Sequence, residues 1–151
     1  MKTELLRTDS DNADFRELVA LLDADLAIRD GAEHLFYAQY NKIDLIREVV
    51  VAYENGEAVG CGAFKEYEPN AAEIKRMYVS PAKRGRGIAR RILAELETWA
   101  KELSFVECVL ETGVKQPEAI ALYRKSGYEK IPNYGQYAGV ENSVCLKKTL
   151  A

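Results

Sequence analysis

The sequence predicts a single α/β domain that spans residues 1–151. Apolar residues recur at helical spacing from residue 88 to 103, directly after a strand-like segment at 73–79. Two further strand-like segments, 49–53 and 58–64, flank the turn Glu-Asn-Gly-Glu, and an Asn-Gly turn is typical of a β-hairpin. Strands and helices therefore alternate within one chain, and no repeat or linker divides it.

The first half of the chain begins with a strand expected at residues 3–8, followed by a helix that residues 9–12 cap. The apolar side of this helix consists of Phe15, Leu18, Val19, Leu22 and Leu26. A second helical segment, rich in aromatic residues, is expected at about 32–41. After the hairpin, a polar loop at 66–72 leads into the strand at 73–79.

The strand at 73–79 has an irregular pattern. In a regular strand, side chains alternate between the two faces, so residues an odd number of positions apart lie on opposite faces. Ile74 would therefore lie on one face and Met77 and Val79 on the other. A β-bulge would bring them to one face and leave a backbone N–H group unpaired. A strand that is buried on both faces is the alternative explanation.

The second half continues with the long helix at 88–103 and a mostly apolar strand at 106–111. Pro117 begins a shorter helix, and Gly127 ends it. Two strands at 128–131 and 143–148 complete the chain.

The loop before the long helix contains Gly85 and Gly87 among several cationic residues. The first N–H groups of a helix lack partners and carry partial positive charge, so this loop predicts a phosphate site. It does not match the Walker pattern, because Gly-Ile-Ala replaces Gly-Lys-Ser/Thr, and the dinucleotide fingerprint fails at Arg90. A basic helix start on a solvated face is the alternative.

The spacing Arg84-x-x-Gly87-x-Ala89 resembles the acyl-CoA loop of the GNAT superfamily of N-acetyltransferases, Gln/Arg-x-x-Gly-x-Gly/Ala. The later Leu122-Tyr123 and Gly127-Tyr128 and the order of elements strengthen the resemblance, which covers nearly the whole chain. It implies a GNAT-like acyl-CoA N-acyltransferase fold, with a mixed, mostly antiparallel sheet and helices on both faces. Strands at 72–79 and 105–111 would run parallel and splay apart to open a cleft.

The resemblance also implies an enzyme that transfers an acetyl group from acetyl-CoA directly to a primary amine of a small molecule or peptide. A bulge in the strand at 73–79 would bind the thioester carbonyl. The residues expected to bind the acetyl-CoA co-substrate are Met77, Tyr78, Val79, Arg84, Gly85, Arg86, Gly87, Ile88 and Ala89. The alternative within this fold is a catalytically inactive acyl-CoA sensor or partner subunit.

Acyl transfer needs a deprotonated amine and a proton for the departing thiolate. Tyr123, in the pattern that the resemblance covers, is the candidate acid, because a phenol is protonated at neutral pH. Glu73 and Glu111 lie on the two strands of the expected cleft and are the candidate bases, of which we favour Glu73. Each of the three could instead be structural, Tyr123 as a core residue and the glutamates as solvated charges.

The acceptor pocket is expected to draw on polar-tipped aromatic residues and their neighbours, which are Tyr37, Tyr40, Asn41, Tyr134 and Tyr137. Half-buried packing around loops is an equally good explanation for them. The single histidine, His34, is not expected to act in catalysis.

Composition excludes several other classes. A net charge of −3 argues against nucleic-acid binding through the basic residues around the loop. Three widely spaced cysteines indicate neither a metal set nor a disulfide, and no segment is apolar and long enough for a signal peptide or a membrane span. We therefore expect a cytoplasmic protein without a metal. A homodimer is one expected state, since members of the superfamily commonly dimerise.

Overall fold

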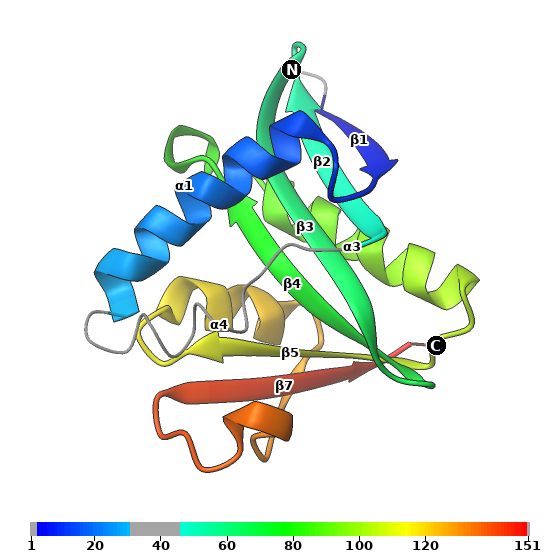
Figure 1. Cartoon of the computed structure of the whole chain (residues 1–151), viewed down its shortest axis with the longest axis vertical. Coiled ribbons are helices and arrows are strands. Elements are labelled where there is room, and N and C mark those ends of the chain that lie inside the picture. The colour runs from blue at the N-terminus through cyan, green and yellow to red at the C-terminus, as the bar shows by residue number, and fades with distance from the viewer. Residues whose placement is uncertain (1–2, 31–45, 151) are drawn as a thin grey trace.

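A mixed β-sheet runs through the centre of the computed structural model, which describes residues 3–30 and 46–150 (Figure 1). Within those residues the sheet has seven strands in the order β1-β2-β3-β4-β5-β7-β6. Neighbouring strands are antiparallel except for β4 and β5, which are parallel. The strands are β1 (Thr3–Thr8), β2 (Glu48–Glu54), β3 (Glu57–Glu68), β4 (Ala71–Val79), β5 (Glu107–Gly113), β6 (Glu129–Ile131) and β7 (Ser143–Thr149).

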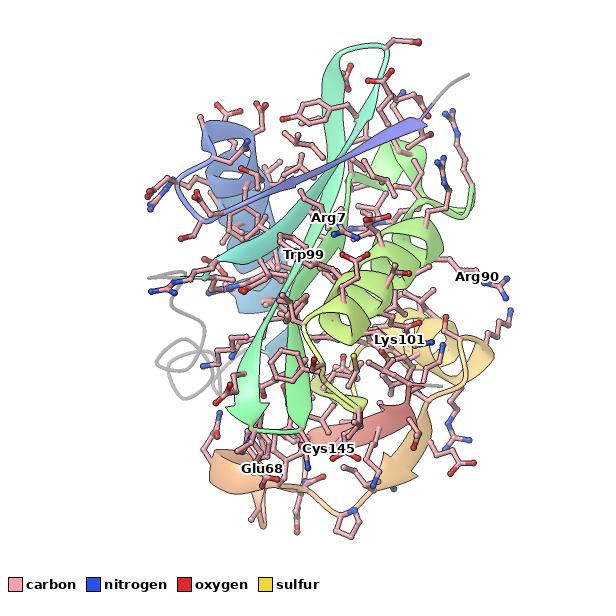
Figure 2. The ribbon with its side chains drawn as sticks, turned by 90° about the vertical axis from the view of Figure 1, so that its right-hand side faces the viewer. Arg7, Glu68, Arg90, Trp99, Lys101 and Cys145 are labelled. Atoms are coloured by element: carbon pink, nitrogen blue, oxygen red, sulfur yellow. The ribbon has the colours of Figure 1, made fainter. Side chains whose placement is uncertain are left out.

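Helices cover both faces of this sheet. Helix α1 (Ala13–Asp30) lies on one face and α3 (Ile88–Glu102) on the other, as Figures 1 and 2 show from two directions. Helix α4 (Pro117–Lys125) shares the hydrophobic cluster of α3, and two short 3-10 helices are η2 (Pro81–Lys83) and η3 (Gly135–Tyr137). The predicted mixed sheet with a parallel pair is confirmed, whereas the helix expected at about 32–41 lies outside the described residues.

Two hydrophobic clusters fill the space between the sheet and the helices. The larger one joins α3 and α4 to the sheet through residues such as Ile92, Leu96 and Tyr123. The smaller one places Phe15 and Val19 of α1 against Val49 and Cys61 of the hairpin strands. The apolar stripes predicted for both helices are therefore the faces that they bury.

A β-bulge interrupts β4 where it pairs with β3. Cys61 lies opposite Tyr78 and Ala63 lies opposite Lys75, so Arg76 and Met77 together face the single residue Gly62. Arg76 has a positive φ of 62°. As a result Ile74, Met77 and Val79 all contact the α3-side cluster, while Tyr78 contacts the α1-side cluster. The predicted bulge is confirmed, and β4 is also buried on both faces.

The polar loop expected at 66–72 is wrong. β3 extends to Glu68 and β4 begins at Ala71, so only Pro69 and Asn70 connect them. The charged side chains of Lys65, Glu66 and Glu68 are exposed. Since these three side chains remain in solvent, residues 65–68 can pair with β4 as an antiparallel strand without burying a charge.

Arg7 fastens the edge strand β1 to helix α3. Its Nε lies 2.6 Å from Glu95 Oε2 and its Nη1 lies 2.7 Å from Glu102 Oε1. The guanidinium carbon lies 5.0 Å from the centre of the Trp99 ring, and Figure 2 shows the two side chains together. These contacts help to fix the helix that begins at the glycine loop.

Gly62 generates a first prediction, because the residue opposite the bulge has no room for a side chain. A Cβ there would lie 2.5 Å from Met77 Sδ and 2.9 Å from both Ile92 Cγ2 and Leu96 Cδ1. Gly62→Ala should lower the free energy of unfolding by about 1–3 kcal/mol, the usual cost of overpacking a core. Urea denaturation would measure it.

Gly113→Ala is the matched control, since a Cβ at that position meets its nearest atom at 3.5 Å. We expect the control to change stability by less than about 0.5 kcal/mol. Equal stability of the two variants would contradict the tight approach of α3 to the bulge.

Candidate active site

Strands β4 and β5 separate partway along their length. They pair through Ala71–Glu107, Ala72–Cys108 and Glu73–Val109, and beyond Glu73 their carboxyl ends diverge (Figure 1). A pocket of about 110 Å³ lies where they diverge. Its wall draws on five parts of the chain: Leu22 and Leu26 of α1, residues 73–77 of β4, residues 111–113 of β5, Gln116, Ala119 and Tyr123 at α4, and Tyr137 of η3.

All three candidate catalytic residues line this pocket, although they are far apart in the sequence. Glu73 is 4% exposed, and its Oε2 accepts a hydrogen bond from the Tyr134 hydroxyl at 2.7 Å. Its Oε1 lies 3.8 Å from Nζ of Lys75, whose pKa is lowered mainly by burial. Glu111, a half-buried residue of β5 whose Oε2 is buried, contributes a second carboxylate. The arrangement places two carboxylates and a phenol around one small space.

Tyr123 lies on α4 and is buried. Its ring contacts the Tyr128 ring edge to face, with the ring centres 5.8 Å apart. Burial, and to a smaller extent the negative charge of Glu111, raises the pKa of the Tyr123 hydroxyl. The hydroxyl is therefore protonated at neutral pH, which is the state that a proton donor needs.

The residues predicted for the acceptor pocket lie in different places. Tyr137 is buried and lines the pocket, and burial is the main cause of its raised pKa. Tyr134 does not line the pocket but holds Glu73, and burial followed by the charge of Glu73 raises its pKa. Tyr37, Tyr40 and Asn41 lie outside the described residues.

Two cations of the pocket wall, Lys75 and Arg76, were not among the predicted site residues. Their side chains are only 7% and 2% exposed. The available signal was the placement of Glu73, Lys75 and Arg76 within an otherwise apolar central strand. Charged residues are almost never buried without a partner, so three of them in such a strand indicate a functional site.

The glycine loop presents free backbone N–H groups at the start of α3. Gly85 and Gly87 have φ angles of 83° and 80°, and a Cβ at either position would meet no atom within 4 Å. The helical bonds begin with Arg91 N–H to the Gly87 carbonyl, at 3.1 Å. In the described part of the chain, the N–H groups of residues 85–90 have no backbone acceptor, and no acidic residue caps the first turn. This geometry suits a phosphate group.

Glu54, at the end of β2, forms ion pairs with two side chains of this loop region. It was not among the predicted site residues. Its buried carboxylate lies 3.1 Å from Lys83 Nζ and 3.0 Å from Arg86 Nη1. The hydrogen bond from Lys83 is the main cause of the lowered pKa of Glu54. Arg84 is fixed separately, because its Nε donates to the Val79 carbonyl at 2.8 Å and its guanidinium lies 5.5 Å from the Tyr78 ring.

The remaining predicted cofactor residues divide by side-chain position. Met77 lines the pocket. Tyr78 and Ile88 are buried in the hydrophobic clusters on opposite faces of the sheet. Val79 and Ala89 flank the loop at the end of β4 and in the first turn of α3.

Within the described ranges, no cluster of three His, Cys, Asp or Glu residues could hold a metal ion. Cys61, Cys108 and Cys145 are all buried and none lines the pocket. Among the described helices, none has the length and apolar character needed to cross a membrane.

The sequence is similar to those of proteins that are named as acetyltransferases. The model of the acetyltransferase (GNAT) family matches residues 12–128. IAA acetyltransferase of Azospirillum brasilense is 40% identical over 102 residues, which cover 67% of each chain. A second relative, the uncharacterized N-acetyltransferase YjgM of Escherichia coli, is 41% identical over 85 residues, or 54% of this chain and 50% of that protein.

The fold is similar to those of solved acyltransferases. The crystal structure of an acyl-CoA N-acyltransferase from Klebsiella pneumoniae superimposes with a TM-score of 0.83 and 29% identity, covering 99% of this chain and 98% of that one. PaiA N-acetyltransferase from Thermoplasma acidophilum, solved with coenzyme A, has the same fold with a TM-score of 0.72 and 19% identity, covering 99% of each chain. The chain therefore belongs to the acetyltransferase (GNAT) family.

Proposed function

We propose that this protein transfers the acetyl group of acetyl-CoA directly to a primary amine, with both substrates bound at the same time. The observation that carries the proposal is the pocket between β4 and β5, where Glu73, Glu111 and Tyr123 meet. Family membership supports acetyl-CoA as the donor and acetyl transfer as the reaction class. The acceptor is a small molecule or a peptide that carries the amine.

The glycine loop fits the pyrophosphate of coenzyme A. The space next to Gly85 and Gly87 is open, and the N–H groups of residues 85–90 are available to phosphate oxygens. Bound there, acetyl-CoA supplies an activated acyl group on a thiol leaving group. Met77 belongs both to the bulge of β4 and to the pocket wall, which supports a role for the bulge in positioning the reacting carbonyl.

The carboxylates of the pocket are suited to removing the proton that the acceptor amine must lose. We favour Glu73, because Tyr134 fixes one of its oxygens and Lys75 lies near the other. A carboxylate held in one orientation can accept a proton from the amine directly or through a water molecule. Glu111, on the opposite strand, is the alternative base.

Tyr123 is suited to protonate the leaving thiolate, since its raised pKa keeps the hydroxyl protonated. Direct transfer is supported by the cysteines. Burial raises the pKa of both Cys61 and Cys108 to about 12, and neither lines the pocket, so neither is placed to form an acyl-enzyme.

Release of free thiol from acetyl-CoA in the presence of a panel of amines tests the proposal as a whole. Amine-dependent thiol release, with mass spectrometry of the acetylated product, is the expected result. Tight binding of acetyl-CoA without turnover across the panel would instead favour a sensor or partner subunit of the same fold.

The second prediction concerns the loop. Gly87→Val should abolish binding of coenzyme A, because the side chain fills the space that a phosphate needs and valine disfavours the φ of 80°. Gly139→Val is the matched control, since Gly139 has a φ of 79° and equally open surroundings. Isothermal titration calorimetry should show the parent affinity for the control. Unchanged affinity of Gly87→Val would rule out this phosphate site.

The third prediction concerns the base. Steady-state kinetics should show kcat/KM lowered by about 10²–10⁴ in Glu73→Gln, the usual worth of general-base catalysis, because glutamine cannot take the proton that the acceptor amine must lose. Glutamine keeps an oxygen that can accept the Tyr134 hydrogen bond, so the fold should survive. Tyr134→Phe removes the hydrogen bond and keeps the carboxylate, and it should lower kcat/KM far less. If Gln at both Glu73 and Glu111 leaves kcat/KM unchanged, neither is the base.

The fourth prediction concerns the acid. Tyr123→Phe removes only the hydroxyl and should lower kcat by about 10²–10⁴, the usual worth of general-acid catalysis, with little change in melting temperature. Tyr128→Phe is the opposite control, because its hydroxyl donates to Glu97 Oε2 at 2.9 Å outside the pocket. It should lower stability and keep kcat. If Tyr123→Phe keeps the parent kcat under conditions where the chemical step limits turnover, Tyr123 is only a core residue and not the acid.

A further inference from the structure

The guanidinium of Arg76 has one edge in use and one edge without a partner. Its Nη1 lies 3.0 Å from Asp23 Oδ1 on α1. Its Nε and Nη2 are buried and, among the described residues, have no hydrogen-bond acceptor. The side chain is 2% exposed, and Arg76 belongs to the wall of the pocket.

An unsatisfied guanidinium edge is unusual in a protein interior. Most buried donors have a partner, and a buried donor on a charged group is especially costly to leave unpaired. The Asp23 ion pair explains why the charge is tolerated but satisfies only one nitrogen. Asp23 itself is half exposed, with a side-chain exposure of 48%, so it only partly neutralises the buried cation. The remaining edge therefore calls for an anion.

The two free nitrogens define the shape of that anion. Nε–H and one N–H of Nη2 lie parallel on one edge of the planar group, which is the geometry that binds the two oxygens of a carboxylate. The charges of the pocket wall agree with this, since Glu73 and Glu111 provide two carboxylates while Lys75 and Arg76 provide two cations. A zwitterion that carries one ammonium and one carboxylate complements such a wall.

We propose that the acceptor is an amine that also carries a carboxylate, such as an amino acid, and that Arg76 binds the carboxylate. This inference rests on the proposed function, because it identifies the class of acceptor for the same pocket. Arg76 and Met77 are the two consecutive residues of the bulge and both line the pocket, so the proposed carboxylate site and the expected acetyl site are neighbours on one strand. Because Nε and Nη2 are shielded from solvent, we expect side chains around them to shift when the acceptor binds.

The unaltered enzyme supplies the first test. Thiol release from acetyl-CoA would be compared for L-alanine, β-alanine and 4-aminobutanoate and for the three corresponding carboxamides. Each amide keeps the amine and the chain length but lacks the negative charge. We expect kcat/KM to be at least about tenfold higher for one of the acids than for its amide, the difference that a hydrogen-bonded charge provides.

Variants then assign the preference to Arg76. Arg76→Lys keeps the cation and a partner for Asp23 but loses the paired N–H donors. It should raise KM for the preferred acid by about 10- to 100-fold, and it should lower kcat/KM at least about tenfold more for the acid than for the amide. Asp23→Asn is the control for a purely structural role, because it weakens the tie between α1 and β4 while the free edge remains. It should retain the preference for the acid.

The outcomes separate this inference from the proposed function. Acetylation of amides and acids at equal rates would overturn the carboxylate site and leave an amine acetyltransferase. No acetylation of any amine, including neutral ones, would overturn the proposed function itself. An equal loss of activity toward acids and amides in both variants, together with a lower melting temperature, would show that Arg76 only joins α1 to β4.

Discussion

Two residues of β4, Arg76 and Met77, face a single residue of β3. This β-bulge determines which side chains of β4 point to the α3 face of the sheet and which point to the α1 face. The positive φ of Arg76 costs about 1–2 kcal/mol in a residue with a Cβ. Burial of one large apolar side chain stabilises by about 1.5–3 kcal/mol, and the bulge lets Ile74, Met77 and Val79 all face α3. The buried side chains therefore offset the strain of the bulge. The bulge lies just beyond Glu73, the last residue of β4 that pairs with β5.

The glycine loop depends on that strand for its position and on Glu54 for its charge balance. Without Glu54, Lys83 and Arg86 would add to the positive field of the helix start with nothing to orient them. With Glu54 present, the side chains of Lys83 and Arg86 bind its carboxylate at the end of β2. Among the described residues, the backbone N–H groups of residues 85–90 have no backbone acceptor. The structure thus separates the two sources of positive charge: Lys83 and Arg86 have a protein partner, and the N–H groups of residues 85–90 have no backbone acceptor in the described part of the chain.

How much could be predicted from the sequence follows the same division. The glycine loop, the stripe of α3 and the parity change in β4 are local patterns, and each led to a correct expectation of structure. The loop expected at 66–72 failed because exposed charges on a long hairpin look like a loop when their pairing partners are unknown. Glu54 could not be recognised as the anchor of the loop, since Lys83 and Arg86 approach it only after the sheet has formed.

The pocket was harder to predict because its wall is assembled from α1, β4, β5, α4 and η3. No spacing along the chain relates Asp23 to Arg76 or Glu73 to Tyr134, and both pairs are the work of tertiary packing. A donor held mainly by backbone groups leaves a glycine signature, because only glycine permits the required φ and the close approach. An acceptor that is bound by side chains leaves no such pattern in the sequence, because the sequence does not show whether a charged residue is exposed to solvent or buried. The partner that each buried charge has, or lacks, is therefore the observation from which we propose the class of acceptor.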